Sequence, residues 1–390
     1  MVIDPWSMPY NGTVVSARRF VSALEEEGCR TTLLAIGGEP RRVPSGEPML
    51  VGFEKMSIPG FNGIIDSMRV PLAKPDRARI RKALEGQDLL HVQFPFFLGR
   101  AAILEARKMG LPVICSFHVQ PENILFNVGL SGSWLRDALY RLFIHEFFDR
   151  ADHVIAPSAF AAKRLKERGA LTPITVVSNG VPERFFDLGR VAQPSGERRL
   201  RVLSVGRLAK EKQQETLLRA VALSRHKSRI SVTLVGSGPE ETTLKRIAAQ
   251  LGLDARIGSL NDQQLMREYV SSDLFVHCSG VELEGMSVLE AMATGNAVIV
   301  SDSAESACAE FVIDARSRFR VGDSVDLTKK IDMWLDAPHL LTEQGEANRR
   351  LAHRFTHQKS LARLLDLYRE VVTGASGRPR LSADADTLAA

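Results

Sequence analysis

Long apolar segments are missing from this sequence of 390 residues. No run of eighteen apolar residues occurs, so we expect no segment that spans a bilayer. The first residues also lack a basic region followed by an apolar core, so we expect no secretory signal. Together these absences predict a cytoplasmic location, and they leave open an attachment at the inner face of the cell membrane.

Cysteine is scarce, and neither sign of charge dominates. No two of the four cysteines form a C-x-x-C pair, and each lies in or beside an apolar segment. This favours buried thiols over disulfides or a metal site. They are Cys29, Cys115, Cys278 and Cys308. A net charge of +5 is too weakly basic to indicate nucleic acid binding, but it suits an anionic substrate or an anionic membrane surface.

What the sequence does contain is an alternation of apolar strands and amphipathic helices that begins twice, near residue 1 and again near Leu200. Its length predicts two domains. We therefore predict an α/β protein of two Rossmann-like, doubly wound domains. The predicted bounds are an N-terminal domain over 1–186, a linker over 187–199, a C-terminal domain over 200–357 and a disordered polar tail over 374–390. The first strand is very short, and its true start could lie upstream.

One stretch of the second half, residues 281–302, places polar residues between an apolar strand and a helix. Its carboxylates Glu282 and Glu290 are separated by seven residues. Ligands of open α/β sheets bind just past the carboxyl ends of the strands, and the N–H groups of a helix start attract phosphate. The residues at this helix start are Gly285, Met286 and Ser287. A phosphate-bearing ligand is therefore predicted at this loop.

A simpler interpretation of the same residues needs no ligand. Ser287 and Glu290 fit a capping box, in which Glu290 only satisfies the helix start. Glu282 and Glu284 would then be solvated loop carboxylates.

Two cations follow the first strand of the second half. Gly206-Arg207 comes directly after the strand, and Lys212 lies five residues further on. The simple interpretation is a solvated charged loop. The next strand ends in a turn that begins at Gly236 and lacks the third glycine of a G-x-G-x-x-G fingerprint, so no nicotinamide cofactor is indicated.

In the first half of the chain, a glycine and a histidine also lie at or just after the carboxyl ends of predicted strands. Gly12 follows the first strand, where a glycine lets the backbone approach a ligand, although it also fits an ordinary turn. His118 ends the apolar strand 112–118, at the functional edge of a sheet. A lone histidine is more often structural, but polar residues follow it at once. They are Gln120, Glu122 and Asn123.

The segment 133–150 is a strongly apolar helix with several arginines among its aromatic and aliphatic residues. One interpretation is a core helix packed on the sheet. The other is an interfacial helix that dips into lipid head groups.

The order of strand, E-x-x-G, LEAMA helix and strand resembles the donor-binding motif of the retaining GT-B glycosyltransferases of family 4. The G-R-L and E-K residues from Gly206 to Lys212 and the N-G-V at 179–181 are also similar to that family. The sequence departs from the family at Glu284, where an aromatic residue is usual. The E-x-E-G form and the H-x-Q-P-E-N segment at 118–123 resemble those of bacterial enzymes that glycosylate membrane glycerolipids and of some surface-polysaccharide enzymes.

The resemblance implies two domains facing a central cleft, and transfer of a hexose from a UDP- or GDP-sugar, with retention, to a glycan or lipid hydroxyl. Arg207 and Lys212 would neutralise the diphosphate, Glu282 would hold sugar hydroxyls and Glu290 the ribose. The implied catalytic residues are His118, Arg207, Lys212 and Glu282. The implied donor-binding residues are Gly12, Gly206, Gly236, Gly285, Met286, Ser287 and Glu290. Gln120, Glu122 and Asn123 would lie on the acceptor side.

The resemblance also implies a final helix, 358–373, that crosses back to the N-terminal domain. No metal and no cofactor beyond the nucleotide sugar are expected, since no Asp-x-Asp dyad accompanies these motifs. Three alternatives share the fold: a nucleotide-sugar 2-epimerase, a phosphorylase, and a non-catalytic sugar-nucleotide-binding subunit. The sequence indicates no phosphate or pyridoxal site for a phosphorylase, and intact Arg207, Lys212, Glu282 and Glu290 argue against a non-catalytic subunit.

Overall fold

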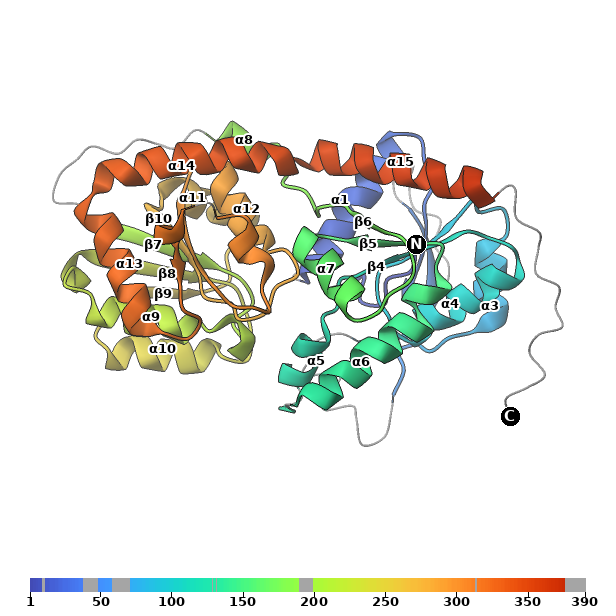
Figure 1. The fold of residues 1–390 in the computed structure, drawn as a ribbon, viewed down its shortest axis with the longest axis horizontal. Helices are drawn as coiled ribbons and strands as arrows, with labels where there is room; N and C mark the ends of the chain where they lie inside the picture. Colours follow the sequence, from blue (N-terminus) through green and yellow to red (C-terminus); the bar gives the residue numbers. More distant parts are fainter. Residues whose placement is uncertain are drawn as a thin grey trace. The chain divides into compact units, whose positions relative to one another are not determined.

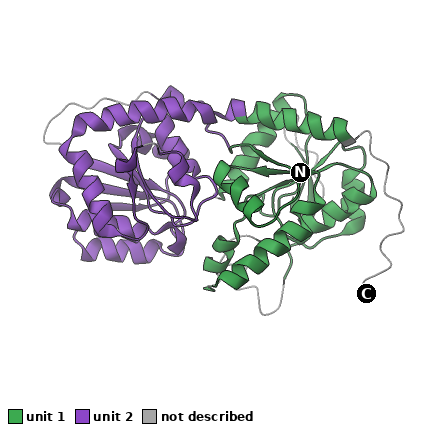
Figure 2. Ribbon diagram, in the orientation of Figure 1, with its two compact units in different colours: residues 1–178, 360–390 green, residues 179–359 purple. Residues whose placement is uncertain are grey.

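The chain divides into two units, coloured separately in Figure 2. Unit 1 comprises Met1–Ser178 and the C-terminal residues from Ser360 on, and unit 2 comprises Asn179–Lys359. The computed structural model describes residues 1–8, 11–37, 48–57, 71–127, 129–130, 132–188, 199–312 and 314–375. Most of the predicted linker, residues 189–198, lies outside the described residues, as does the predicted disordered tail from residue 376 on.

Unit 1 is built on parallel strands (Figure 1). One sheet has the order β3-β4-β5-β6 and the other pairs β1 with β2. Its strands are β1 (Thr32–Ile36), β2 (Met49–Phe53), β3 (Leu90–Val92), β4 (Val113–Ser116), β5 (His153–Ala156) and β6 (Ile174–Val176). Its helices are α1 (Gly12–Glu26), α3 (Arg77–Leu84), α4 (Phe97–Lys108), α5 (Pro121–Asn127), α6 (Ser133–Glu146) and α7 (Ala159–Glu167). The predicted first strand is reduced to Val2, which bridges Leu34 of β1 and Val92 of β3.

Unit 2 is built on one parallel six-stranded sheet with the order β12-β11-β10-β7-β8-β9. Its strands are β7 (Leu200–Val205), β8 (Ile230–Val235), β9 (Asp254–Gly258), β10 (Leu274–His277), β11 (Ala297–Ser301) and β12 (Arg318–Phe319). Its helices are α8 (Arg184–Asp187), α9 (Gln214–Leu223), α10 (Glu241–Gln250), α11 (Asp262–Ser271), α12 (Met286–Ala293), α13 (Ser324–Asp336) and α14 (Pro338–Ala352). The β10–β11 pair is buried along its whole length, as expected of strands covered by helices on both faces.

The boundary between the units differs from the predicted one. Residues 179–186, assigned from sequence to the N-terminal domain, belong to unit 2. Val181 pairs with Thr356, and the ring of Phe185 meets that of Tyr269 edge-on at 5.6 Å. The residues that form each contact are far apart in the sequence, so local composition predicted the boundary at the polar linker instead.

The final helix, α15 (His357–Ala375), is longer than predicted and packs on unit 1. Its leucines Leu361, Leu364 and Leu367 join a buried cluster with Phe20 and Leu24 of α1. It is also tied to the sheet by a polar contact, because Tyr368 Oη lies 2.6 Å from Nδ1 of buried His91. Among the described residues, no helix combines the length and apolar character that crossing a bilayer requires.

Candidate functional site

The predicted donor-binding residues of unit 2 follow neighbouring strands of its sheet. Gly206 and Arg207 follow β7, Gly236 follows β8, and Glu282 lies in the loop after β10. Since β10, β7 and β8 are adjacent and parallel, their carboxyl ends share one edge of the sheet. This edge is where ligands of doubly wound sheets bind.

Packing explains the glycine after β8 without reference to a ligand. A Cβ on Gly236 would lie 2.0 Å from the carbonyl oxygen of Gly206, so a side chain does not fit between the two turns. Gly206, by contrast, has open space where a Cβ would stand. A packing role for Gly236 therefore stands beside its predicted donor role.

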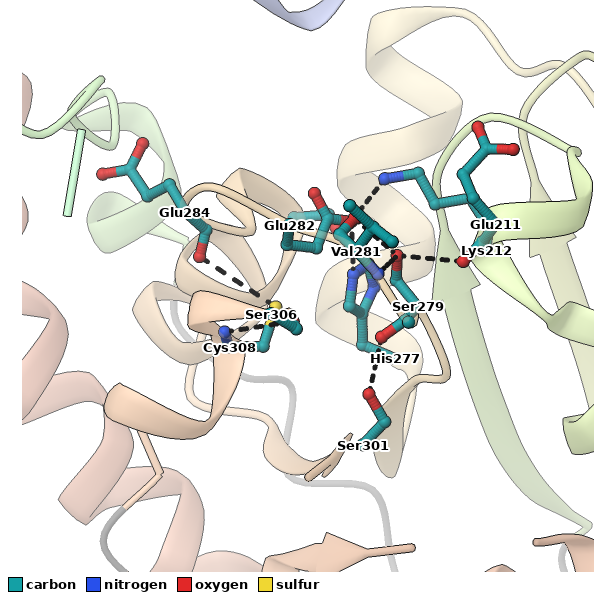
Figure 3. A network of polar contacts seen from close by, with 12 residues as sticks. Glu211, Lys212, His277, Ser279, Val281, Glu282, Glu284, Ser301, Ser306 and Cys308 are labelled. Carbon is teal, nitrogen blue, oxygen red and sulfur yellow. Dashed lines mark hydrogen bonds and ion pairs between the residues drawn. The ribbon is translucent and has the colours of Figure 1, made fainter. Parts of the chain in front are cut away.

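The centre of the site is a cluster of Lys212, Glu282 and His277 (Figure 3). Lys212 ends a short 3₁₀ turn, and its ammonium donates a hydrogen bond to Glu282 Oε1. His277 ends β10, and its Nε2 lies 2.8 Å from the same oxygen. Glu282 Oε2 has no hydrogen-bond partner among the described residues, and the Glu282 side chain is 15% exposed. One carboxylate oxygen is thus fixed by two protein groups, and the other is open to a ligand.

The charges of this pair are mutually stabilised. Burial by itself would raise the pKa of the Glu282 carboxyl, but Lys212 and His277 outweigh burial and hold that pKa well below its usual range. Burial likewise opposes the charge of Lys212, yet Glu282 raises the Lys212 pKa above its usual value. The lowered pKa of Glu282 and the raised pKa of Lys212 both mean that the two groups are ionised at neutral pH.

We expect the cluster to make stability sensitive to acid. A carboxyl whose pKa is depressed by folding contributes stability above its unfolded pKa, near 4.5, and loses that contribution as the pH falls below it. The melting temperature of wild type should therefore fall more steeply below about pH 4.5 than that of Glu282→Gln, which has no such proton to bind. Melting curves at a series of pH values test this, and parallel curves for the two proteins would contradict it.

Arg207 lies beside a buried acidic residue. Its Nε is 3.6 Å from Oε1 of Glu211, and Gln214 donates a hydrogen bond of 2.8 Å to the Arg207 carbonyl. Glu211 is buried and Arg207 half-buried. The interpretation of this segment as a solvated charged loop is therefore wrong.

The start of α12 is set by a glycine. Gly285 has φ +88°, and a Cβ there would lie 2.4 Å from the Cys308 sulfur, so only glycine fits. Met286 and Ser287 begin the helix, which has no side-chain cap. The capping-box interpretation is wrong, because the buried Glu290 accepts a hydrogen bond of 3.1 Å from the Tyr269 hydroxyl.

Glu284, the departure from the family pattern, is buried rather than solvated. Its carboxylate accepts hydrogen bonds from the backbone N–H of Asn179, at 3.2 and 3.1 Å to its two oxygens, and from the Asn179 side-chain amide. The loop is thus held at two points, through Glu282 by Lys212 and His277, and through Glu284 by Asn179.

The predicted residues of unit 1 lie near the ends of their elements. Gly12 is the first residue of α1 and has open space around it, while Asn11 caps the helix by accepting from Thr13 and Val14. His118 is half-buried two residues beyond β4, and burial lowers its pKa to about 4. It is therefore neutral at physiological pH and suited to hydrogen bonding rather than to binding an anion by charge.

The predicted acceptor-side residues are more buried than expected. Gln120 is fully buried, and the largely buried Glu122 accepts a hydrogen bond of 3.0 Å from the Tyr140 hydroxyl of α6. Asn123 is half-buried in α5. The helices α5 and α6 contact each other beside this segment (Figure 1), and the acceptor-side role of the three residues stays a prediction.

Sequence reasoning missed two residues of the unit 2 site. His277 gave a usable signal, because it ends the strand that precedes the E-x7-E motif. Asn179 gave none as a partner of Glu284, since 105 residues separate the two.

Known families match both halves of the chain. A profile for the glycosyltransferases of family 4 matches residues 10–185, and one for the group 1 glycosyl transferases matches residues 187–351. D-inositol 3-phosphate glycosyltransferase 2 of Catenulispora acidiphila is 30% identical over 72% of this chain and 70% of its own length. The alpha-monoglucosyldiacylglycerol synthase of Streptococcus pneumoniae is 26% identical over 54% of this chain, which spans only about half, 51%, of that relative.

A solved structure shows the same fold. Anabaena Alr3699/HepE in complex with UDP and glucose matches with a TM-score of 0.72 and 17% identity, over 97% of this chain and 99% of the other. One of the two relatives is named as a glycosyltransferase and the other as a glucosyldiacylglycerol synthase. The two profiles, the long match at 30% identity and the fold agree with the predicted two-domain α/β architecture. The chain therefore belongs to the group 1 glycosyltransferases of family 4, which are transferase enzymes of the GT-B fold.

Proposed function

We propose that this chain transfers a hexose from a UDP- or GDP-sugar to the hydroxyl of a membrane glycerolipid or a surface glycan, with retention of the anomeric configuration. The observation that carries the proposal is the Lys212–Glu282–His277 cluster at the carboxyl ends of the unit 2 strands. It combines a fixed cation with a carboxylate that has one open oxygen. Such a pair suits a ligand with a phosphate at one end and hydroxyls at the other.

The donor would be held by charge and by hydroxyl contacts. Lys212 has three N–H donors and gives one to Glu282, so two remain for phosphate oxygens. Arg207 and the N–H groups of Met286 and Ser287 would add to this stabilisation as the diphosphate leaves. Glu282 Oε2 would accept from sugar hydroxyls, and Glu290 from the ribose.

No protein nucleophile is assigned. The leaving phosphate would help to take the acceptor proton, and neutral His118 would contact the transferred sugar from the acceptor side. Gln120, Glu122 and Asn123 would lie on the acceptor side, next to the α5–α6 pair. We expect no metal requirement and no cofactor beyond the co-substrate.

Lipid as the acceptor class is supported by two observations. One relative is named as a monoglucosyldiacylglycerol synthase. The second observation concerns α6, which buries Tyr140, Phe143 and Ile144 and leaves other large apolar side chains exposed. Trp134 and Leu142 of α6 are 72% and 51% exposed, and Phe126 and Leu130 are exposed beside its start.

We therefore expect α6 to mediate membrane attachment. Trp134→Ser combined with Leu142→Ser should lower the partition constant for vesicles containing anionic lipid about 30-fold or more in a cosedimentation assay, because each removes apolar surface worth about 1 kcal/mol or more on insertion. Leu223→Ser in unit 2 removes a comparably exposed leucine and serves as the control. Equal binding by wild type and the double variant would rule out this attachment site.

The donor is tested by ligand addition. Melting temperatures with UDP-, GDP- and ADP-sugars, without added metal, should rise with one carrier, because a ligand at 100 times its Kd stabilises the folded state by about 2.7 kcal/mol. That carrier then defines the donor for a screen of lipid and glycan acceptors. A complete absence of shifts, together with an absence of transfer or hydrolysis of every donor, would overturn the proposal.

A further inference from the structure

Gln213, between Lys212 and α9, has an unusual backbone. Its φ of 49° and ψ of 35° make it the one non-glycine residue with positive φ among those that the structure describes. Left-handed backbone disfavours side chains with a Cβ, and such outliers gather at functional sites. Glycine would adopt this conformation freely, so a long amide side chain here needs an explanation.

The side chain of Gln213 reaches the loop that carries Glu282. A Cβ added to Gly280 would lie 2.7 Å from the Gln213 amide nitrogen, and one added to Gly322 would lie 3.6 Å from its amide oxygen. The amide thus lies against two positions that have no side chains. Gly280 is held in this position, because its N–H donates a hydrogen bond of 2.9 Å to the Glu211 carbonyl oxygen.

The amide also has unused hydrogen-bonding capacity. Gln213 is half-buried, and its side chain makes no hydrogen bond within the described residues. An amide both donates and accepts, which matches a hydroxyl group. It is next in sequence to Lys212 and lies at Gly280, two residues before Glu282.

We propose that Gln213 is a specificity-determining residue that hydrogen-bonds a hydroxyl of the donor sugar. This inference rests on the proposed function, in which Lys212 holds the diphosphate and Glu282 holds sugar hydroxyls. The Gln213 amide, which lies beside Gly280, would contact a second hydroxyl of the sugar in addition to those that Glu282 holds. It would therefore help the site to distinguish hexoses that differ in the orientation of one hydroxyl.

Gln213→Gly tests the inference directly. The variant should melt at or above the wild-type temperature, because glycine adopts the left-handed backbone without strain. Its kcat/KM for the preferred nucleotide sugar should fall about 10-fold, the effect of one lost hydrogen bond, and its preference over epimeric sugars on the same carrier should narrow. Its Kd for UDP or GDP without a sugar should stay at the wild-type value.

Gly280→Ala provides an independent test that leaves the Gln213 backbone unchanged. Its added methyl group must push the Gln213 amide aside, so it should lower kcat/KM in the wild-type background but have little further effect in Gln213→Gly. Gly374→Ala in α15, where nothing lies within 4 Å of the added Cβ, is the matched control and should leave kcat/KM unchanged.

Unchanged sugar preference in Gln213→Gly would overturn the inference, as would equal effects of Gly280→Ala in both backgrounds. If Gln213→Gly melts well below wild type, the residue has a structural role, and Gly280→Ala alone then decides. These outcomes are separate from failure of the proposed function, in which wild type itself neither binds nor turns over any nucleotide sugar.

Discussion

Lys212→Ala should lower kcat by about 10²- to 10³-fold, the usual effect of removing one preorganised group that stabilises developing charge. Lys212 is fixed by Glu282 and needs little reorganisation when the diphosphate leaves. The same removal leaves Glu282 paired with His277 alone, so we also expect a modest loss of thermal stability. Steady-state kinetics and melting curves on the same preparation separate the two effects.

Lys210→Ala is the matched control for this variant. Lys210 lies in the same 3₁₀ turn but is exposed, and we assign it no contact with the donor. Its activity should match that of wild type. A Lys212→Ala variant that folds and retains near-wild-type turnover would contradict the proposed diphosphate role, and with Arg207→Ala equally active it would contradict the donor site as a whole.

Glu284→Ala should be the most destabilising single change at the site, at about 3 kcal/mol. It removes the acceptor of the Asn179 backbone and side-chain hydrogen bonds, and hydrogen bonds to a buried charged group contribute about 1.5–3 kcal/mol. For a unit of this size the melting temperature should fall by about 6–12 °C. Thermal or urea unfolding measures this directly.

Two variants sharpen the interpretation. Glu284→Gln keeps the shape and one acceptor oxygen, so we expect it to recover most of the lost stability. Glu346→Ala removes a glutamate that is 69% exposed, and it should melt within about one degree of wild type. Glu284→Ala that melts like Glu346→Ala would show that the Asn179 contact contributes nothing to folding.

The fold and most of the site's composition could be predicted from sequence, for a local reason. Apolar strands alternate with amphipathic helices, and polar residues follow the strand ends, so the pattern alone places Arg207, Lys212 and Glu282 at one sheet edge. Gly285 could be placed at a helix start because this glycine directly precedes the apolar helix that contains LEAMA. The family followed from the same short motifs, and the two matching family profiles confirm it.

Only the tertiary structure decided which of these side chains meet. The contacts of Glu282 with Lys212 and of Glu284 with Asn179 span 70 and 105 residues, and no local pattern encodes such pairs. Burial in the folded chain likewise placed Gln120 in the interior and moved residues 179–186 into unit 2. The sequence by itself determined the elements and the order in which polar residues follow them, because these depend on periodicity and turn chemistry. Pairing, burial and the left-handed backbone of Gln213 depend on packing between distant segments, so the tertiary structure alone determined them.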